Sequence, residues 1–122
     1  MYGTAPAICS EEKKPKFAES CVNLGSPRLG AVVTDVSDEF FAPRDRMLAD
    51  ATPVFYPDRY DENGKWMDGW ETRRRRGGGN DWCIIQLGAK AIIHGVDINT
   101  RFFTGNHPTS VRIEGTLENG EP

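Results

Sequence analysis

The chain has 122 residues, of which 38% are hydrophobic and 27% charged, and its net charge is −3. This length suits one domain at most, and the hydrophobic share is enough for a packed core. The acidic balance argues against a nucleic-acid partner, which usually selects a basic excess. No apolar stretch is long enough to span a membrane and no signal peptide is recognisable, so we expect a cytoplasmic protein without a membrane partner.

The first elements in chain order are short. Residues 1–16 lack hydrophobic periodicity and are expected to form a flexible tail. A strand is expected at 31–34, within "RLGAVVTDVS". Pro43 is expected to start a helical turn that ends near Leu48, because a proline at the first helical position gives up no hydrogen bond.

The rest of the chain indicates further strands. Two prolines keep "PVFYPDRYDENGKW" extended, and Asn63–Gly64 within it is typical of a turn. "WETRRR" is expected to be a strand and "GGGN" a loop. "DWCIIQL" has apolar residues on both faces, which favours a central strand covered on both sides. "AIIHGVDI" and the alternating "VRIEG" are also expected to be strands, joined by the polar loop "NTRFFTGNHP".

These patterns indicate five or six short strands and almost no helix, so the expected class is all-β, most simply a β-sandwich. A complete jelly roll needs about eight strands, and we do not find that many. The polar end of the chain contains no closing strand. We therefore expect the fold to be incomplete.

The cysteines and histidines do not form a metal motif. Cys9, Cys21 and Cys83 are odd in number and repeat no short spacing, which argues against both a disulfide framework and a zinc site. Cys83 lies in an apolar run, where a buried free thiol is the usual state. His94 lies on an expected strand and is interpreted as a core histidine. We expect no tightly held metal and no cofactor.

The densest charge lies beside the bulkiest apolar residues. Residues 65–82, "KWMDGWETRRRRGGGNDW", contain all three tryptophans and four consecutive arginines. On a strand, Arg74 would share one face with Trp70, and Arg73 and Arg75 would share the other with Glu71. An unpaired guanidinium is very costly to bury, so these arginines need carboxylates, a bound anion or solvent.

Three interpretations of this segment stay open. It is a solvated strand end beside a tryptophan core, with Asp68, Glu71 and Asp81 as the nearest partners for the arginines. It is a localisation or nucleic-acid patch, against which the acidic total counts. Or it is an arginine fork that grips a small carboxylate, since the planar donors of arginine match a carboxylate at two points.

Seven blocks, in the same order and with similar spacing, resemble the allantoicase family: "VNLGSPRLGA", "DEFFAP", "PVFYPDRY", "GKWMDGWETRRRR", "DWCIIQLG", "GVDINTRFFTGNHP" and "VRIEG". The resemblance implies two tandem repeats, each a jelly-roll β-sandwich of the galactose-binding or discoidin-like type. Residues 17–122 would form part of the first repeat. It also implies a hydrolase that converts allantoate to ureidoglycolate and urea, a step of allantoin and purine degradation.

Allantoate is a small anion with two ureido groups on one carbon, so the implied reaction needs three kinds of group. Arg73, Arg74 and Arg75 are the candidates for holding the carboxylate, with Arg101 as an outside candidate. For any one of them, a structural ion pair is the alternative.

Asp68 and Glu71 are the candidates for proton transfer, because they lie three apart beside aromatic residues that exclude water. The alternative is that Glu71 pairs with an arginine and Asp68 makes a turn with Gly69. Asn106 and His107, in the polar loop, are candidates for binding the substrate. Alternatively, they hold their loop and lie at the surface.

A second function from another class stays open: a jelly-roll module that binds a small polar or anionic ligand without chemistry, since this architecture hosts both. In either case we expect a homo-oligomer or packing against a second repeat. A jelly roll without its last strands exposes strand edges and apolar core. We therefore expect the chain alone to be marginally stable, oligomeric or prone to aggregation.

Overall fold

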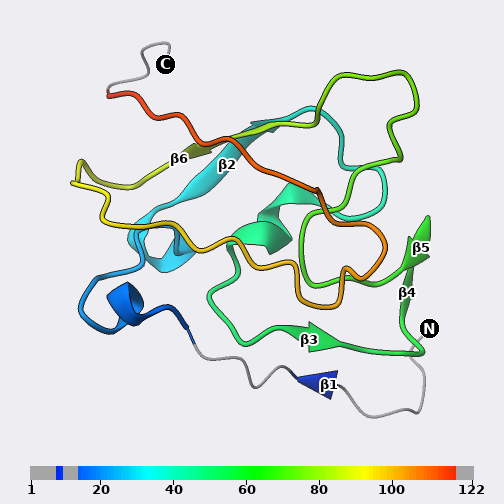
Figure 1. Ribbon diagram of the computed structural model, residues 1–122. Helices are drawn as coiled ribbons and strands as arrows, with labels where there is room; N and C mark the ends of the chain where they lie inside the picture. The colour runs from blue at the N-terminus through cyan, green and yellow to red at the C-terminus, as the bar shows by residue number, and fades with distance from the viewer. Residues whose placement is uncertain (1–7, 10–13, 118–122) are drawn as a thin grey trace.

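The computed structural model describes residues 8–9 and 14–117, so most of the expected tail 1–16 lies outside the described residues (Figure 1). The regular elements are short strands and 3-10 turns, with no α-helix among the described residues, which confirms the all-β class. No helix in this part of the chain is long and apolar enough to cross a membrane. In chain order the elements are β1 Ile8–Cys9, η1 Lys16–Glu19, η2 Pro27–Leu29, β2 Val32–Val36, η3 Arg44–Leu48, β3 Val54–Phe55, β4 Tyr60–Asp61, β5 Gly64–Lys65 and β6 Cys83–Gln86.

The longest pairing joins β2 and β6, which run antiparallel at the upper left of Figure 1. Val33 lies opposite Ile85, and the register shifts between Val33 and Asp35. The carbonyl at this bulge, that of Thr34, accepts a hydrogen bond from Nη1 of Arg44 at 3.2 Å, so an arginine satisfies the group that the irregular register leaves unpaired. The strand expected at 31–34 is confirmed as β2.

Two further pairs are only two residues long. β1 pairs with β3, and β4 pairs with β5 as a hairpin. Tyr60 lies opposite Lys65 and Asp61 opposite Gly64, which confirms the turn expected at Asn63–Gly64 and places its centre one residue earlier. The turn expected after Pro43 is also confirmed, as η3, with the proline in the capping position just before it.

The strands expected in the last third of the chain are not formed. Residues 91–98 and 111–115 lie in no strand, and Figure 1 shows the chain after β6 leaving the sheet and returning towards it without pairing. β6 pairs only with β2, and Ile84 and Ile85 are 53% and 40% exposed, so the expectation of a covered central strand is wrong. Alternation of apolar residues suits a strand, but a strand also needs a neighbour for its backbone groups, and among the described residues these segments have none.

The buried apolar core is small. Among the described residues it consists of Ala31, Val33, Ala42, Met67 and Phe103. In contrast, Ile92 is 80% exposed, and His94 on the same segment is exposed rather than in the core as expected. The core therefore lies where β2, the residues before η3 and the segment 66–71 meet, and this is also where the polar groups described next converge.

Two glycines allow η2 to pack against the turn after β6. Gly30 ends η2 with a φ of 92°, a left-handed conformation that side-chain-bearing residues rarely adopt. Gly88 lies directly against it, and a Cβ at that position would collide with the carbonyl oxygen of Leu29. The contact between two backbones therefore requires glycine at position 88.

Candidate functional site

A hollow of ≈ 330 Å³ lies beside the β4–β5 hairpin. This volume is at the lower end of the range for small-molecule sites, which are usually apolar with a few polar groups. The polar side chains here are Lys65, Glu71, Thr104 and Asn106. The other lining residues are Phe41, Phe55, Gly64, Met67 and Phe102. We call this space the Glu71 hollow.

Glu71 is held at the hollow through its backbone. Its N–H donates to the carbonyl of Ala42 at 3.2 Å, and the N–H of Ala42 donates back at 3.1 Å. The side chain then accepts a hydrogen bond at Oε2 from Nδ2 of Asn106 at 2.6 Å. Two residues singled out separately in the sequence, 35 positions apart, therefore lie in direct contact. Within the described chain Glu71 makes no ion pair with an arginine, so that alternative interpretation of Glu71 is wrong.

Phe102 forms one wall of the hollow in an unusual conformation. Its φ is 72°, which is uncommon for a bulky residue and costs conformational energy that surrounding contacts must offset. Its ring stacks on Phe55 with a centroid distance of 5.9 Å and an interplanar angle of 24°. The guanidinium of Arg101 lies over the same ring at 5.1 Å. Sequence reasoning did not single out Phe102.

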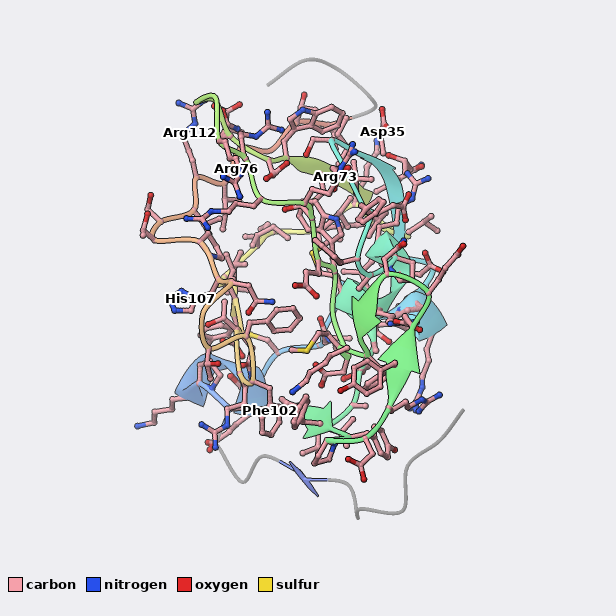
Figure 2. The ribbon with its side chains drawn as sticks, turned by 90° about the vertical axis from the view of Figure 1, so that its right-hand side faces the viewer. Asp35, Arg73, Arg76, Phe102, His107 and Arg112 are labelled. Carbon is pink, nitrogen blue, oxygen red and sulfur yellow. The ribbon has the colours of Figure 1, made fainter. Side chains whose placement is uncertain are left out.

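A second, larger hollow of ≈ 520 Å³ also has Phe102 in its lining, together with Arg101, Thr104 and His107. Phe102 and Thr104 line both hollows. The ring nitrogen Nδ1 of His107 lies 3.1 Å from the carbonyl oxygen of Pro108, and Figure 2 shows the ring at the outer side of its segment. His107 and Asn106 are thus adjacent in sequence but face different spaces.

Asp68 lies outside both hollows. Its Oδ2 accepts a hydrogen bond from the backbone N–H of Val54 at 2.7 Å, which ties β3 to the segment before Glu71. In sequence Asp68 and Glu71 lie three apart, but their side chains bind partners on different elements, Val54 and Asn106. The structure therefore does not bring the two carboxylates to one set of partners.

The strand expected in "WETRRR" is reduced to the single bridge between Ala42 and Glu71. The expected alternation of faces fails as a result. Thr72 and Arg75 would point to opposite faces of a strand, but both donate to Asp81, at 3.2 and 2.9 Å. Of the three carboxylates expected to partner the arginines, only Asp81 does so.

Arg73 is held by a carboxylate that sequence reasoning missed. Asp38 accepts the backbone N–H of Arg73 at 2.6 Å and its Nε at 3.0 Å, and the arginine lies over the ring of Phe40 at 5.2 Å. Arg74 and Arg76 are exposed and make no ion pair with a described residue. None of the four arginines at positions 73–76 lines the Glu71 hollow.

Both carboxylates beside the arginine run are stabilised in the charged form. Burial raises the pKa of Asp38, but hydrogen bonds from the N–H groups of Arg73 and Phe40 and from the Arg73 guanidinium outweigh it, so this pKa lies below its usual value. Burial also raises the pKa of Asp81, and donation from Arg75, Ser37 and Thr72 again lowers it overall. These two residues act as anchors for the arginine run.

The tryptophans do not form a common core. Trp66 packs edge-on to Tyr56 at 5.3 Å, and the guanidinium groups of Arg46 and Arg59 lie over its ring at 5.2 and 4.7 Å. Trp70 donates from Nε1 to the carbonyl of Asp38 at 2.7 Å. Trp82 is 44% exposed. The interpretation with a common tryptophan core is therefore wrong: the rings of Trp66 and Trp70 contact different segments, and Trp82 is exposed.

Cys83 is a free thiol, as expected, but it is half-buried rather than buried, and burial raises its pKa. Among the described residues no group of three or more His, Cys, Asp or Glu side chains could hold a metal ion. The polar groups at the Glu71 hollow are a carboxylate, an amide, a hydroxyl and an amine, a set suited to binding a polar organic molecule.

Comparisons with known proteins show the family of this chain. A sequence model of the allantoicase repeat matches residues 22–121. A protein of Ralstonia nicotianae named "Probable allantoicase" is 55% identical over 109 residues, which cover 88% of this chain and 32% of that protein. "Probable allantoicase 1" of Burkholderia mallei is 50% identical over 114 residues, covering 93% and 34%.

A "Probable allantoicase" of Acinetobacter baylyi is 52% identical over 101 residues, covering 83% of this chain and 30% of that protein. The chain thus spans about a third of the length of the curated relatives it matches. No solved structure matches it significantly.

Proposed function

This chain belongs to the allantoicase family, and we propose that the protein it forms hydrolyses allantoate to ureidoglycolate and urea. The observation that carries the proposal from the family to these residues is the contact between Glu71 and Asn106 at the wall of a small hollow. Because the chain spans about a third of its relatives, we propose that the hollow is one part of the substrate site.

The reaction consumes one water molecule. The oxygen of this water keeps one hydrogen and bonds to the central carbon of allantoate, and the bond from that carbon to one ureido nitrogen breaks. The other proton of the water ends on the departing nitrogen. A group that accepts a proton from water and supplies one to the leaving urea therefore helps both halves of the step. We assign this role to Glu71. Its Oε2 is occupied by Asn106, whereas its Oε1 accepts no hydrogen bond from a described residue.

Asn106 fits the ureido groups. Its Nδ2 holds Glu71 in place, and its Oδ1 is an acceptor that matches a ureido N–H. A carboxylate and an amide oxygen side by side form an acceptor-rich wall, which suits a ureido group with its several N–H donors. The hydroxyl of Thr104 adds a group that can both donate and accept.

We propose different roles for the other candidate residues. Asp68 is proposed as a positioning residue that ties β3 to the segment carrying Glu71. His107 would contact substrate or product from the second hollow. Arg73 and Arg75 hold Asp38 and Asp81, so of the three arginines proposed for the substrate carboxylate Arg74 is the one whose guanidinium has no described ion pair.

For the fold, we propose a jelly-roll sandwich of the galactose-binding or discoidin-like type, with residues 17–122 contributing part of one repeat. The exposed apolar residues support this, because Ile84, Ile92 and Ile113 are each more than half exposed and suit a core contributed by further polypeptide. Their exposure also supports packing against a second repeat or a second copy of the chain.

The proposed function is tested by urea release from allantoate. Two proteins are compared: this chain alone, and a joined protein in which the chain replaces its matched third of the Ralstonia nicotianae relative. We expect release of urea and ureidoglycolate in equal amounts from the joined protein. Binding of allantoate without urea release would favour the non-catalytic binding module. If the joined protein neither binds allantoate nor releases urea, the proposal is overturned.

A further inference from the structure

Lys65 differs from the other cations near the proposed site. It is the only positively charged side chain among the described residues lining the Glu71 hollow. Its Nζ lies 6.0 Å from the centroid of the Phe55 ring, and no described carboxylate lies within ion-pair distance of it. Sequence reasoning gave it no role, because only the fold places Lys65, on β5, in the lining of the same hollow as Glu71.

The arginines are placed differently. Arg73 and Arg75 form ion pairs with Asp38 and Asp81, at 3.0 and 2.9 Å. Arg74 is exposed and lines neither of the two hollows. A small anion that contacts Glu71 and Asn106 would therefore meet the ammonium group of Lys65 before it met any of these guanidinium groups.

The charges of the hollow are complementary to a ligand with a carboxylate at one end and N–H donors at the other. The carboxylate of Glu71 and the amide oxygen of Asn106 accept hydrogen bonds, whereas Lys65 has three N–H donors and no acceptor. A ligand carboxylate placed beside Glu71 would be repelled, but at Lys65 it would form a charge-assisted hydrogen bond. The rings of Phe55 and Phe102 line the same hollow, while Lys65 itself is exposed and can be reached by a ligand from solution.

We propose that Lys65 binds the carboxylate of the substrate, and thereby orients it so that a ureido group faces Glu71 and Asn106. The ligand class is a small α-substituted carboxylate whose substituent carries amide-type N–H groups. This inference rests on the proposed function for the identity of the substrate, but the placement of a carboxylate at Lys65 can be tested without catalysis.

The first experiment compares kcat/KM of the joined protein for allantoate and for its neutral carboxamide. For Lys65→Met, we expect the preference for allantoate over the carboxamide to fall at least about tenfold, as expected on losing one charge-assisted hydrogen bond. Turnover of the carboxamide would show that the variant is folded. Lys65→Arg should keep most of the preference, and Lys16→Met, an exposed lysine that lines neither hollow, should keep all of it.

The second experiment acetylates surface lysines with and without allantoate and reads each site by mass spectrometry. We expect allantoate to protect Lys65 and not Lys16. An inert wild-type protein would overturn the proposed function, while protection of Lys65 would still support the carboxylate site. An unchanged substrate preference in Lys65→Met, a preference lost only in Arg74→Met, or no protection of Lys65 would each overturn the inference.

Discussion

Asp38 is predicted to contribute more to stability than the arginine it holds. Its carboxylate accepts two backbone N–H groups, of Arg73 at 2.6 Å and of Phe40 at 3.2 Å, and its side chain is only 15% exposed. A hydrogen bond to a charged group contributes about 1.5 kcal/mol or more, and partial access of water lowers the sum. We expect Asp38→Ala to lower the free energy of unfolding by about 2 kcal/mol.

Arg73→Ala keeps both backbone bonds to Asp38. It removes an ion pair in which the arginine side chain is 65% exposed and a contact with the ring of Phe40. Contacts this exposed contribute about 0.5 kcal/mol each, so we expect a loss of about 1 kcal/mol. As a control, Arg112→Ala breaks an ion pair whose arginine is 87% exposed and should change the free energy by less than about 0.5 kcal/mol.

The assay is urea unfolding followed by tryptophan fluorescence. Trp70 is a local reporter, because its indole donates to the carbonyl of Asp38. An equal loss of unfolding free energy in Arg73→Ala and Asp38→Ala would refute this prediction, since the ion pair and not the backbone bonds would then dominate. The prediction would also be refuted if Asp38→Ala had no measurable effect.

Three further predictions concern packing, acid and thiol chemistry. Gly88→Ala should lower the free energy of unfolding by about 1–3 kcal/mol, because the added Cβ meets the backbone of Leu29. In the control Gly105→Ala the Cβ enters open space, and equal effects of the two substitutions would contradict the close approach at Gly88. Asp38 and Asp81 have lowered pKa values, so their contribution to stability is present above about pH 4 and is lost as pH falls through the folded-state pKa values. The free energy of unfolding should therefore drop in acid, and it should drop less steeply with pH in Asp38→Asn. The same dependence on pH in both proteins would be inconsistent with this. Iodoacetamide should modify exposed Cys21 faster than Cys83, whose pKa is raised by burial, as peptide mass spectrometry would show; faster reaction of Cys83 would contradict the assigned burial.

Local signals in the sequence predicted local structure. The proline before η3 and the Asn63–Gly64 pair act within a few residues, so the turns at both places follow from the sequence itself. The strands expected after β6, at 91–98 and 111–115, were predicted wrongly for the opposite reason. Strand formation at Ile92 or Ile113 depends on a neighbouring strand, and periodicity alone does not supply one.

The candidate site could likewise be predicted only where the signal is local. Glu71 and Asn106 were singled out from residue type and from the family resemblance, but their contact depends on the path of the chain over 35 positions. Nearness in sequence identified Asp81 as a partner for Arg75 and missed Asp38, which is equally far from its arginine as Asn106 is from Glu71. Lys65 lies in the family block "GKWMDGWETRRRR", but nothing in that block assigned it a role, and only the fold brings it to the hollow.

The most direct test of the account is urea release from allantoate by the joined protein and by its Glu71→Gln variant. Glu62→Gln is the matched control, since Glu62 is exposed on the β4–β5 turn and lines neither hollow. We predict that Glu71→Gln lowers kcat about 10²–10⁴-fold, the usual contribution of proton transfer by a side chain, while Glu62→Gln leaves it unchanged. Full activity in Glu71→Gln would contradict the assignment of this hollow as part of the active site.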